Sequence, residues 1–355
     1  MSGAGMAWAQ TSIPEGGGRP EEQWKEHNVR GRGPGHPADR LIENQKALEI
    51  ARRGLEREPA SIAWLNALWV SCLAVGEAQE MVGERSDALV SLNEGKAVVE
   101  RLVEIEPANI RWQEAMAMFW SAIGLASIPD EQGEAALSAF DAELAIRRHL
   151  AEAAPSDARA RTNLMYSLHN LGSAQMKRGR FADAEASYRE ALAIAEEVGA
   201  KGNAHRQGDL SAMYARVGAA LLAQGDVQAA REYFDKSLMI AERLVREDQK
   251  DIGRLLALGE VQDFLGRTSL RWGNLEQAVQ SFRAALATQQ RVLALHPQDP
   301  AWQMRVSNSL LALGMVLARQ GLAEEARDAL RRGRGIVVEL GASPDWFDEQ
   351  LSKLN

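Results

Sequence analysis

Few residues in this sequence have the types and spacing that catalysis needs. Its six histidines are scattered along 355 residues, and no two are spaced to bind a metal ion from one helix face. The sequence has no phosphate-binding loop, no His-Glu-x-x-His, no Cys-x-x-Cys and no Gly-x-Ser-x-Gly motif. The single cysteine, Cys72, fits a small core residue, because a nucleophile would need a histidine partner. We therefore predict a protein that is not an enzyme, with no catalytic residue, metal site or cofactor.

One set of charged residues does have a regular spacing. Glu260, Asp263, Arg267 and Arg271 lie three or four residues apart, which would place them on one face of a helix. Two interpretations remain open: the four side chains pair with one another, or the arginines bind an acidic stretch of another protein. What this set does therefore depends on the helices that position it.

The chain is organised around a repeat marked by six glycines, called here the frame glycines. They are Gly76, Gly124, Gly172, Gly218, Gly266 and Gly314, and successive members are 48, 48, 46, 48 and 48 residues apart. An alanine follows each frame glycine by twelve residues, and a large apolar residue follows it by sixteen. Self-similarity at a fixed period of about 20–50 residues is typical of stacked repeat proteins. We therefore expect one continuous solenoid, in which each repeat contacts only its neighbours.

Each column of the repeat has a steric role. A frame glycine lets a neighbouring helix approach closely because it has no Cβ. Seven residues later, in every repeat except the second, which has Glu131, a second glycine such as Gly83 or Gly225 stands where a helix should end in a left-handed turn. The apolar spacing beyond that turn is typical of a second amphipathic helix. The predicted helix pairs are 60–82/85–106, 108–128/133–154, 156–178/181–199, 205–224/227–247, 250–272/275–295 and 299–320/322–340.

This order of small and apolar residues resembles the tetratricopeptide repeat (TPR), and the resemblance covers residues 60–340. The usual TPR period is about 34 residues, so the longer period here would lengthen each helix by roughly two turns. Long-helix arrays of this kind occur in bacterial signalling proteins, and the phrase Pro-x-x-x-x-Trp-Gln, seen here at Pro107 and Pro297, is typical of them. Glu143 departs from the pattern, because the family has a small residue at that position.

The resemblance implies an all-α fold, an α-solenoid wound as a right-handed superhelix, with about six TPR-like helix pairs plus capping helices. Residues 1–19 are predicted to be a disordered tail, and 20–58 a degenerate repeat that ends in an N-terminal cap helix. In that segment Trp24 falls at an aromatic position and Gly35 at a turn position, although the pattern for a first helix near Glu21–His27 is weak. The six repeats would be 59–106, 107–154, 155–200, 201–248, 249–296 and 297–341.

Residues 342–355 are predicted to form a C-terminal capping helix. Trp346, Phe347 and Leu351 would cover the open end of the array there, as solenoid ends require.

In TPR arrays the first helix of each pair lines the concave side, so the resemblance also implies which residues face a binding groove. The candidates for contact with a partner segment are Leu73, Glu77, Met118, Leu125, Tyr166, His169, Lys177, Ala215, Leu222, Glu260, Asp263, Arg267, Arg271, Asn308 and Arg319. TPR proteins that grip a C-terminal carboxylate have Lys and Asn early in the groove. Leu73 and Glu77 stand there instead, which argues against that mode of binding.

Composition limits the class of partner. The net charge is −8, and 25% of the residues are charged, with both signs mixed, which argues against a nucleic-acid-binding face. The basic run 331–334 fits a solvated helix end. No run of 18 apolar residues predicts a membrane span. Ala7-Trp8-Ala9 looks like a cleavage site but lacks the preceding basic and apolar regions of a signal peptide. We therefore expect a cytoplasmic location, with secretion or a periplasmic location less well supported.

These observations favour a non-enzymatic scaffold or adaptor for protein–protein interaction, for example the sensor or regulatory part of a bacterial signalling or defence system. The expected partner is another protein or a peptide segment, without nucleic acid or a membrane span. The alternative is a self-assembling structural solenoid, since repeat arrays can stack with copies of themselves. A third reading, an unrecognised site at Tyr166, His169 and Lys177, has no motif to support it.

Overall fold

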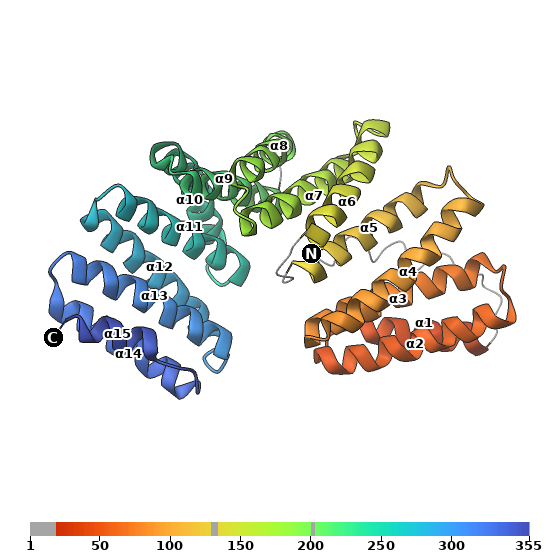
Figure 1. The fold of residues 1–355 in the computed structure, drawn as a ribbon, viewed down its shortest axis with the longest axis horizontal. Coiled ribbons are helices and arrows are strands. Elements are labelled where there is room, and N and C mark those ends of the chain that lie inside the picture. Colours follow the sequence, from red (N-terminus) through yellow and green to blue (C-terminus); the bar gives the residue numbers. More distant parts are fainter. Residues whose placement is uncertain (1–18, 129–133, 200–202, 355) are drawn as a thin grey trace. The chain divides into compact units, whose positions relative to one another are not determined.

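The computed structural model describes residues 19–128, 134–199 and 203–354, and within these ranges the chain is all α-helical, with no β-strand (Figure 1). The helices are α1 (Arg19–Arg32), α2 (Pro37–Arg57), α3 (Ile62–Val82), α4 (Arg85–Ile105), α5 (Ile110–Ser127), α6 (Glu134–Ala153), α7 (Ala158–Lys177), α8 (Phe181–Gly199), α9 (Ala204–Gln224), α10 (Val227–Glu247), α11 (Ile252–Arg271), α12 (Leu275–Leu295), α13 (Pro300–Arg319), α14 (Ala323–Glu339) and α15 (Asp345–Ser352). From α3 to α14 every boundary lies within two residues of the one predicted from the repeat. The predicted disordered tail lies outside the described residues, apart from Arg19.

The helices pack into two compact units. The first ends at Arg178 and holds α1 to α7, and the second begins at Gly179 and holds α8 to α15. Within each unit, consecutive helices lie side by side, as expected for stacked helix pairs (Figure 1). The predicted all-α solenoid of helix pairs is confirmed, whereas the limits of the individual repeats stay a prediction.

The frame glycines lie where two helices of a pair cross at close range. A Cβ built on Gly218 would stand 2.8 Å from Cε1 of Phe234, and one on Gly266 would stand 2.8 Å from Cε1 of Phe282. Gly76, Gly124 and Gly314 meet Leu92, Phe140 and Leu330 in the same way. Each of these partners is the large apolar residue sixteen positions later, so the two columns recognised in the sequence pack against each other.

Both ends of the first helices are fixed by local chemistry. The turn glycines end them in the left-handed region, with φ of 88° at Gly83 and 91° at Gly225, which residues with a Cβ rarely adopt. Each first helix begins at a polar N-cap whose side chain accepts a backbone N–H bond, fifteen residues before the frame glycine. These caps are Ser61, Asn109, Asp157, Asn203, Asp251 and Asp299. Such caps each stabilise a helix by about 1 kcal/mol.

The N-terminal segment forms a complete helix pair, α1 and α2. Trp24 is buried on α1, and its indole N–H donates to Ser71 Oγ of α3 at 2.8 Å, which anchors the pair to the first repeat. The sequence pattern predicts a helix near Glu21–His27 only weakly, whereas the structure has α1 over Arg19–Arg32. Gly35 lies in the bend between α1 and α2, although without the positive φ of the turn glycines in the repeats.

The C-terminal helix α15 covers the end of the second unit through one aromatic residue. Phe347 is buried against α14, and its ring would clash at 2.4 Å with a Cβ on Gly333. Leu351 packs partly buried in the same cluster. Trp346 is 68% exposed, so the expectation that it covers the end is wrong: its neighbour fills that space.

Candidate interaction surface

The charged set on α11 is divided among several partners. Asp263 and Arg267 form an ion pair at 2.6 Å within the helix. Glu260 instead pairs with Arg216 of α9 at 2.9 Å, and Arg271 donates to the backbone carbonyl of Leu222 at the end of α9. Self-pairing therefore accounts for two of the four residues, while the other two connect neighbouring first helices.

These contacts show how the first helices of the second unit lie relative to one another. The helices α9 and α11 approach each other directly, although the second helix α10 separates them in the sequence. The face of α11 that carries Glu260 and Arg271 therefore borders the facing side of α9. We call the exposed residues of α11 and α13 on this side, together with the partly buried Asp263, the first-helix face: Glu260, Asp263, Arg267, Arg271, Asn308, Met315 and Arg319.

Solvent reaches much of the first-helix face. The Arg267 side chain is 62% exposed in spite of its ion pair, and Met315 is 40% exposed, which is high for a methionine. Arg271, Asn308 and Arg319 are also exposed. Desolvation raises the pKa of Asp263, and the neighbouring Glu260 adds to the rise, while Arg267 opposes it. The surface thus combines exposed guanidinium groups with an accessible thioether.

Three of the predicted contact residues are buried. Leu73, Ala215 and Leu222 are 4%, 3% and 7% exposed, and Leu73 belongs to the core cluster of the first unit. Their side chains pack between helices in this structure, so the expectation that they line an open groove is not met, and a contact role for them stays a prediction. The cause is the close approach of neighbouring first helices, which covers small and apolar positions.

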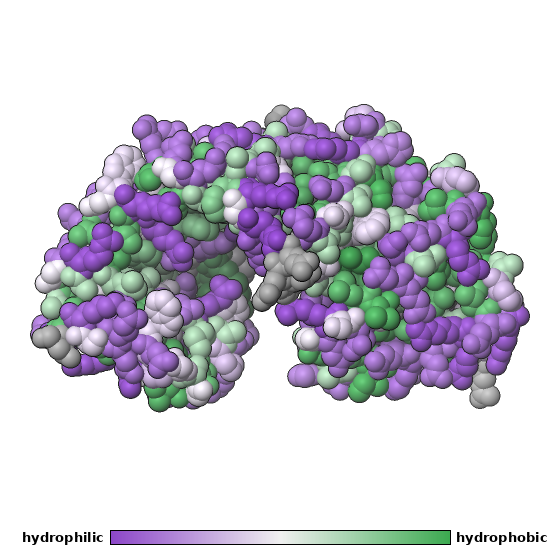
Figure 2. Space-filling model, viewed as in Figure 1, coloured by the Kyte–Doolittle hydropathy of each residue, from purple (hydrophilic) through white to green (hydrophobic). Residues whose placement is uncertain are grey.

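The first unit presents a more apolar set on its first helices. Leu125 of α5 is 42% exposed, Met81 at the end of α3 is 54% exposed, and Met118 is half-buried. On the side seen in Figure 2, hydrophobic residues interrupt the hydrophilic surface of this unit over α3 to α5. Solvent-exposed apolar residues of this kind are suited to docking the apolar side of another chain.

Glu77 is the acidic exception on this apolar surface. Its side chain keeps contact with solvent, but the dense surroundings desolvate the carboxylate and raise its pKa, an effect that Arg32 and Arg40 partly offset. On α7, Tyr166 and His169 are partly buried and Lys177 is exposed. The structure thus places these three on one helix without assembling a catalytic group from them.

A buried charged pair in the first unit was not recognised from the sequence. Glu143 and Arg147 on α6 are 3% and 9% exposed and lie 3.8 Å apart. Ser167 of α7 donates to Glu143 Oε1 at 2.7 Å, whereas Glu143 Oε2 and Arg147 Nε have no hydrogen-bond partner. Burial raises the pKa of Glu143, and the Ser167 hydroxyl and the Arg147 charge oppose this. The only sign of this pair in the sequence is Glu143 itself, which stands where the TPR pattern has a small residue.

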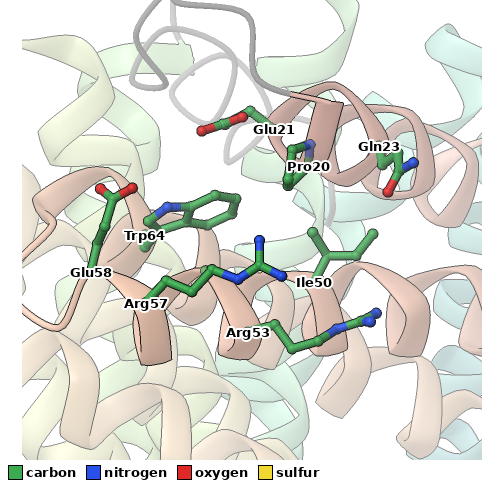
Figure 3. Close-up of a pocket in the computed structure, with 9 residues that line it drawn as sticks. Pro20, Glu21, Gln23, Ile50, Arg53, Arg57, Glu58 and Trp64 are labelled. Carbon is green, nitrogen blue, oxygen red and sulfur yellow. The ribbon is translucent and has the colours of Figure 1, made fainter.

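Two cavities lie in the first unit. One, of about 170 Å³, lies between α1, α2 and the start of α3, where Arg53, Arg57 and Trp64 face Glu21 and Glu58 (Figure 3). Its cations and carboxylates offset one another, and it holds no histidine, serine or cysteine. A second, of about 440 Å³, is an open apolar hollow between α4, α5 and α6, lined by Val103, Met116 and Ile146.

Among the described ranges, no three His, Cys, Asp or Glu side chains converge as metal ligands would. No described helix combines the length and the apolar character that crossing a bilayer requires.

The architecture is that of an α-solenoid of helix pairs. Residues 164–198 and 210–249 match the sequence profile of the tetratricopeptide repeat family, so this chain contains tetratricopeptide repeats, as the glycine and alanine columns predicted. The two matched segments begin 46 residues apart, which is also the distance from Gly172 to Gly218. The search of curated proteins found no match.

Solved structures agree with this fold. The apo form of RapI is similar over 93% of this chain and 79% of its own, with a TM-score of 0.62 and 13% identity. BtubC (BKLC) from P. vanneervenii matches 73% of this chain and 93% of its own, with a TM-score of 0.57 and 18% identity. A chain of the APC/C hetero-tetramer Cut9-Hcn1 has a TM-score of 0.51 and 15% identity over 95% of this chain and 60% of its own. At these identities the likeness shows the fold alone.

Proposed function

We propose that this protein is a non-enzymatic scaffold that binds a segment of a partner protein on the exposed side of its first helices. The observation that carries the proposal is the contrast along α11 and α13. The residues of these helices that pack against neighbouring helices are buried. By contrast, Arg267, Asn308, Met315 and Arg319 stay exposed on the first-helix face. Stacked repeats generally use such variable surface positions for recognition.

Site-specific photo-crosslinking tests this proposal. A benzophenone amino acid would replace Asn308 on α13 or Leu125 on α5, and matched controls would carry it on second helices. Met239 of α10 is 68% exposed and Val90 of α4 is 69% exposed, so both controls are as accessible as the test sites. We expect one and the same partner to be captured from the first helices and not from Met239 or Val90. Equal capture at all four sites would contradict the proposal.

The proposal extends to a regulatory role in the cytoplasm of a bacterium, as the sensor or adaptor of a signalling or defence system. The supports are the long-helix repeat and the free, buried thiol of Cys72, since unpaired cysteine is common where the cell keeps thiols reduced. Identification of the captured partner as a signalling or effector protein tests this role. A partner with a purely metabolic activity would contradict it.

A second candidate function is self-assembly through the C-terminal end. It is favoured by Trp346, which lies 68% exposed on the terminal helix α15, because a large exposed aromatic often marks a contact surface. Light scattering across protein concentration would decide: an increase in mass that Trp346→Ser abolishes supports self-assembly. A monomer at high concentration removes it.

A further inference from the structure

Positive charge is concentrated on the first helices of the second unit. The helices α9, α11 and α13 contain seven arginines and three carboxylates, a net charge of +4, in a chain whose overall net charge is −8. The second helices paired with them, α10, α12 and α14, together carry only +1. The excess of positive charge in these three pairs therefore lies on the first helices.

The carboxylates on these helices do not neutralise the arginines of the first-helix face. Glu260 is engaged by Arg216 and Asp263 by Arg267. Arg271 bonds only a backbone carbonyl, which carries no net charge to cancel its own. Arg319 makes no hydrogen bond or ion pair within the described ranges, and Arg305 lies over the Trp302 ring at 5.4 Å. Positive charge thus remains available at the C-terminal ends of α11 and α13.

The helix dipole explains only part of this arrangement. A cation in the last turn of a helix is favourable, which accounts for Arg271 and Arg319. Arg267 lies one turn earlier, and its 62% exposure lets the guanidinium contact a second carboxylate beside Asp263. Met315 of α13 is equivalent to Arg267 of α11, because each directly follows a frame glycine. Met315 is 40% exposed. Cationic and apolar groups therefore alternate along one face.

We propose that this face binds an acidic segment of a partner protein, with carboxylates toward Arg267, Arg271 and Arg319 and an apolar side chain toward Met315; this inference rests on the function proposed above. Arg267 and Arg271 lie about one turn apart on α11, which is about 6 Å along the helix axis, and an extended chain rises about 3.3 Å per residue. Acidic residues that reach both arginines are therefore about two positions apart. Guanidinium groups suit this recognition because they bind carboxylates in a bidentate manner.

Fluorescence anisotropy with a defined probe tests the inference. The probe is a labelled library of twelve-residue peptides with glutamates fixed two positions apart and uncharged residues elsewhere. The triple variant Arg267→Gln, Arg271→Gln, Arg319→Gln should weaken binding about tenfold, since each exposed ion pair contributes only modestly to affinity. The control triple Arg246→Gln, Arg291→Gln, Arg331→Gln removes the same charge from exposed second-helix positions and should leave binding unchanged. Circular dichroism melting curves confirm that both variants fold.

The possible results separate this inference from the proposed function. Equal loss in both triple variants would overturn the inference, because binding would then follow net charge alone. Binding of an oligothymidylate of the same charge as tightly as the peptides would also overturn it, in favour of a nucleic-acid face. A partner could be captured by photo-crosslinking at Asn308 while no acidic peptide binds. That result would support the scaffold function and overturn the inference that the bound segment is acidic.

Discussion

Glu143 and Arg147 occupy core positions that other repeats fill with small or apolar residues. The residues equivalent to Glu143 are Gly95, Ala191, Ser237, Ala285 and Gly333. At the position of Arg147, the buried equivalents are Val99, Ala195, Ala241 and Val337. The second repeat has thus exchanged an apolar contact for a charged pair, whose desolvation offsets most of its attraction.

A substitution of one partner should expose the cost of this pair. Glu143→Leu leaves the buried Arg147 charge without its nearest carboxylate, and we expect a loss of about 3–5 kcal/mol in the free energy of unfolding. The double variant Glu143→Leu, Arg147→Met should recover most of the loss, because it restores an apolar contact. Urea denaturation of the parent and both variants measures this. A double variant as unstable as the single one would show that the pair itself is needed.

The raised pKa of Glu143 also gives a pH dependence. Burial is its main cause, so the folded protein binds this proton more tightly than the unfolded chain. The contribution of such a group to the free energy of unfolding decreases as the pH rises above its unfolded pKa of about 4.3. We therefore expect Glu143→Gln to gain stability relative to the parent between about pH 4 and pH 7. A difference in denaturation midpoint that stays constant over this range would contradict the assignment.

At the scale of the elements, close packing at the frame glycines sets how the two helices of a pair cross. Gly218→Val would place side-chain atoms against the Phe234 ring, where even a Cβ stands only 2.8 Å away, and should cost roughly 1–3 kcal/mol. Gly208 of the same helix offers the matched control, because nothing lies within 4 Å of its Cβ position. Gly208→Ala should stabilise by about 0.4–1 kcal/mol. Thermal or urea denaturation compares the stability of the two variants. If both variants were destabilised equally, the loss would not come from close packing at Gly218.

The helices were predictable from the sequence because glycine columns, turn glycines and apolar spacing all indicated the same boundaries. The candidate surface was less accessible. Frame positions alone could not show that Leu73 and Ala215 are covered by neighbouring helices, since burial depends on how closely the repeats approach. Nor could spacing show that Glu260 bonds Arg216 of another repeat, because intrahelical partners at three and four residues looked equally suitable.

At the scale of the whole molecule, a solenoid needs a covered end, since a terminal repeat lacks a neighbour. Phe347 supplies this cover at the end of the second unit, and Phe347→Ala should cost about 3–5 kcal/mol locally. The adjacent Trp346→Ala should change stability by less than about 0.5 kcal/mol, because that ring is exposed. Hydrogen exchange should show the loss confined to α13, α14 and α15. Equal effects of both variants would contradict the capping role.

The column of N-caps has a consequence for how such a chain can change in length. Every first helix from α3 to α13 starts at its own cap, fifteen residues before its frame glycine. A segment cut from one cap to the next therefore carries its own signals for starting and ending both helices. Duplication or loss of such a cassette by recombination would join matching ends, so an array of this kind can gain or lose binding positions in whole steps without redesign of its core.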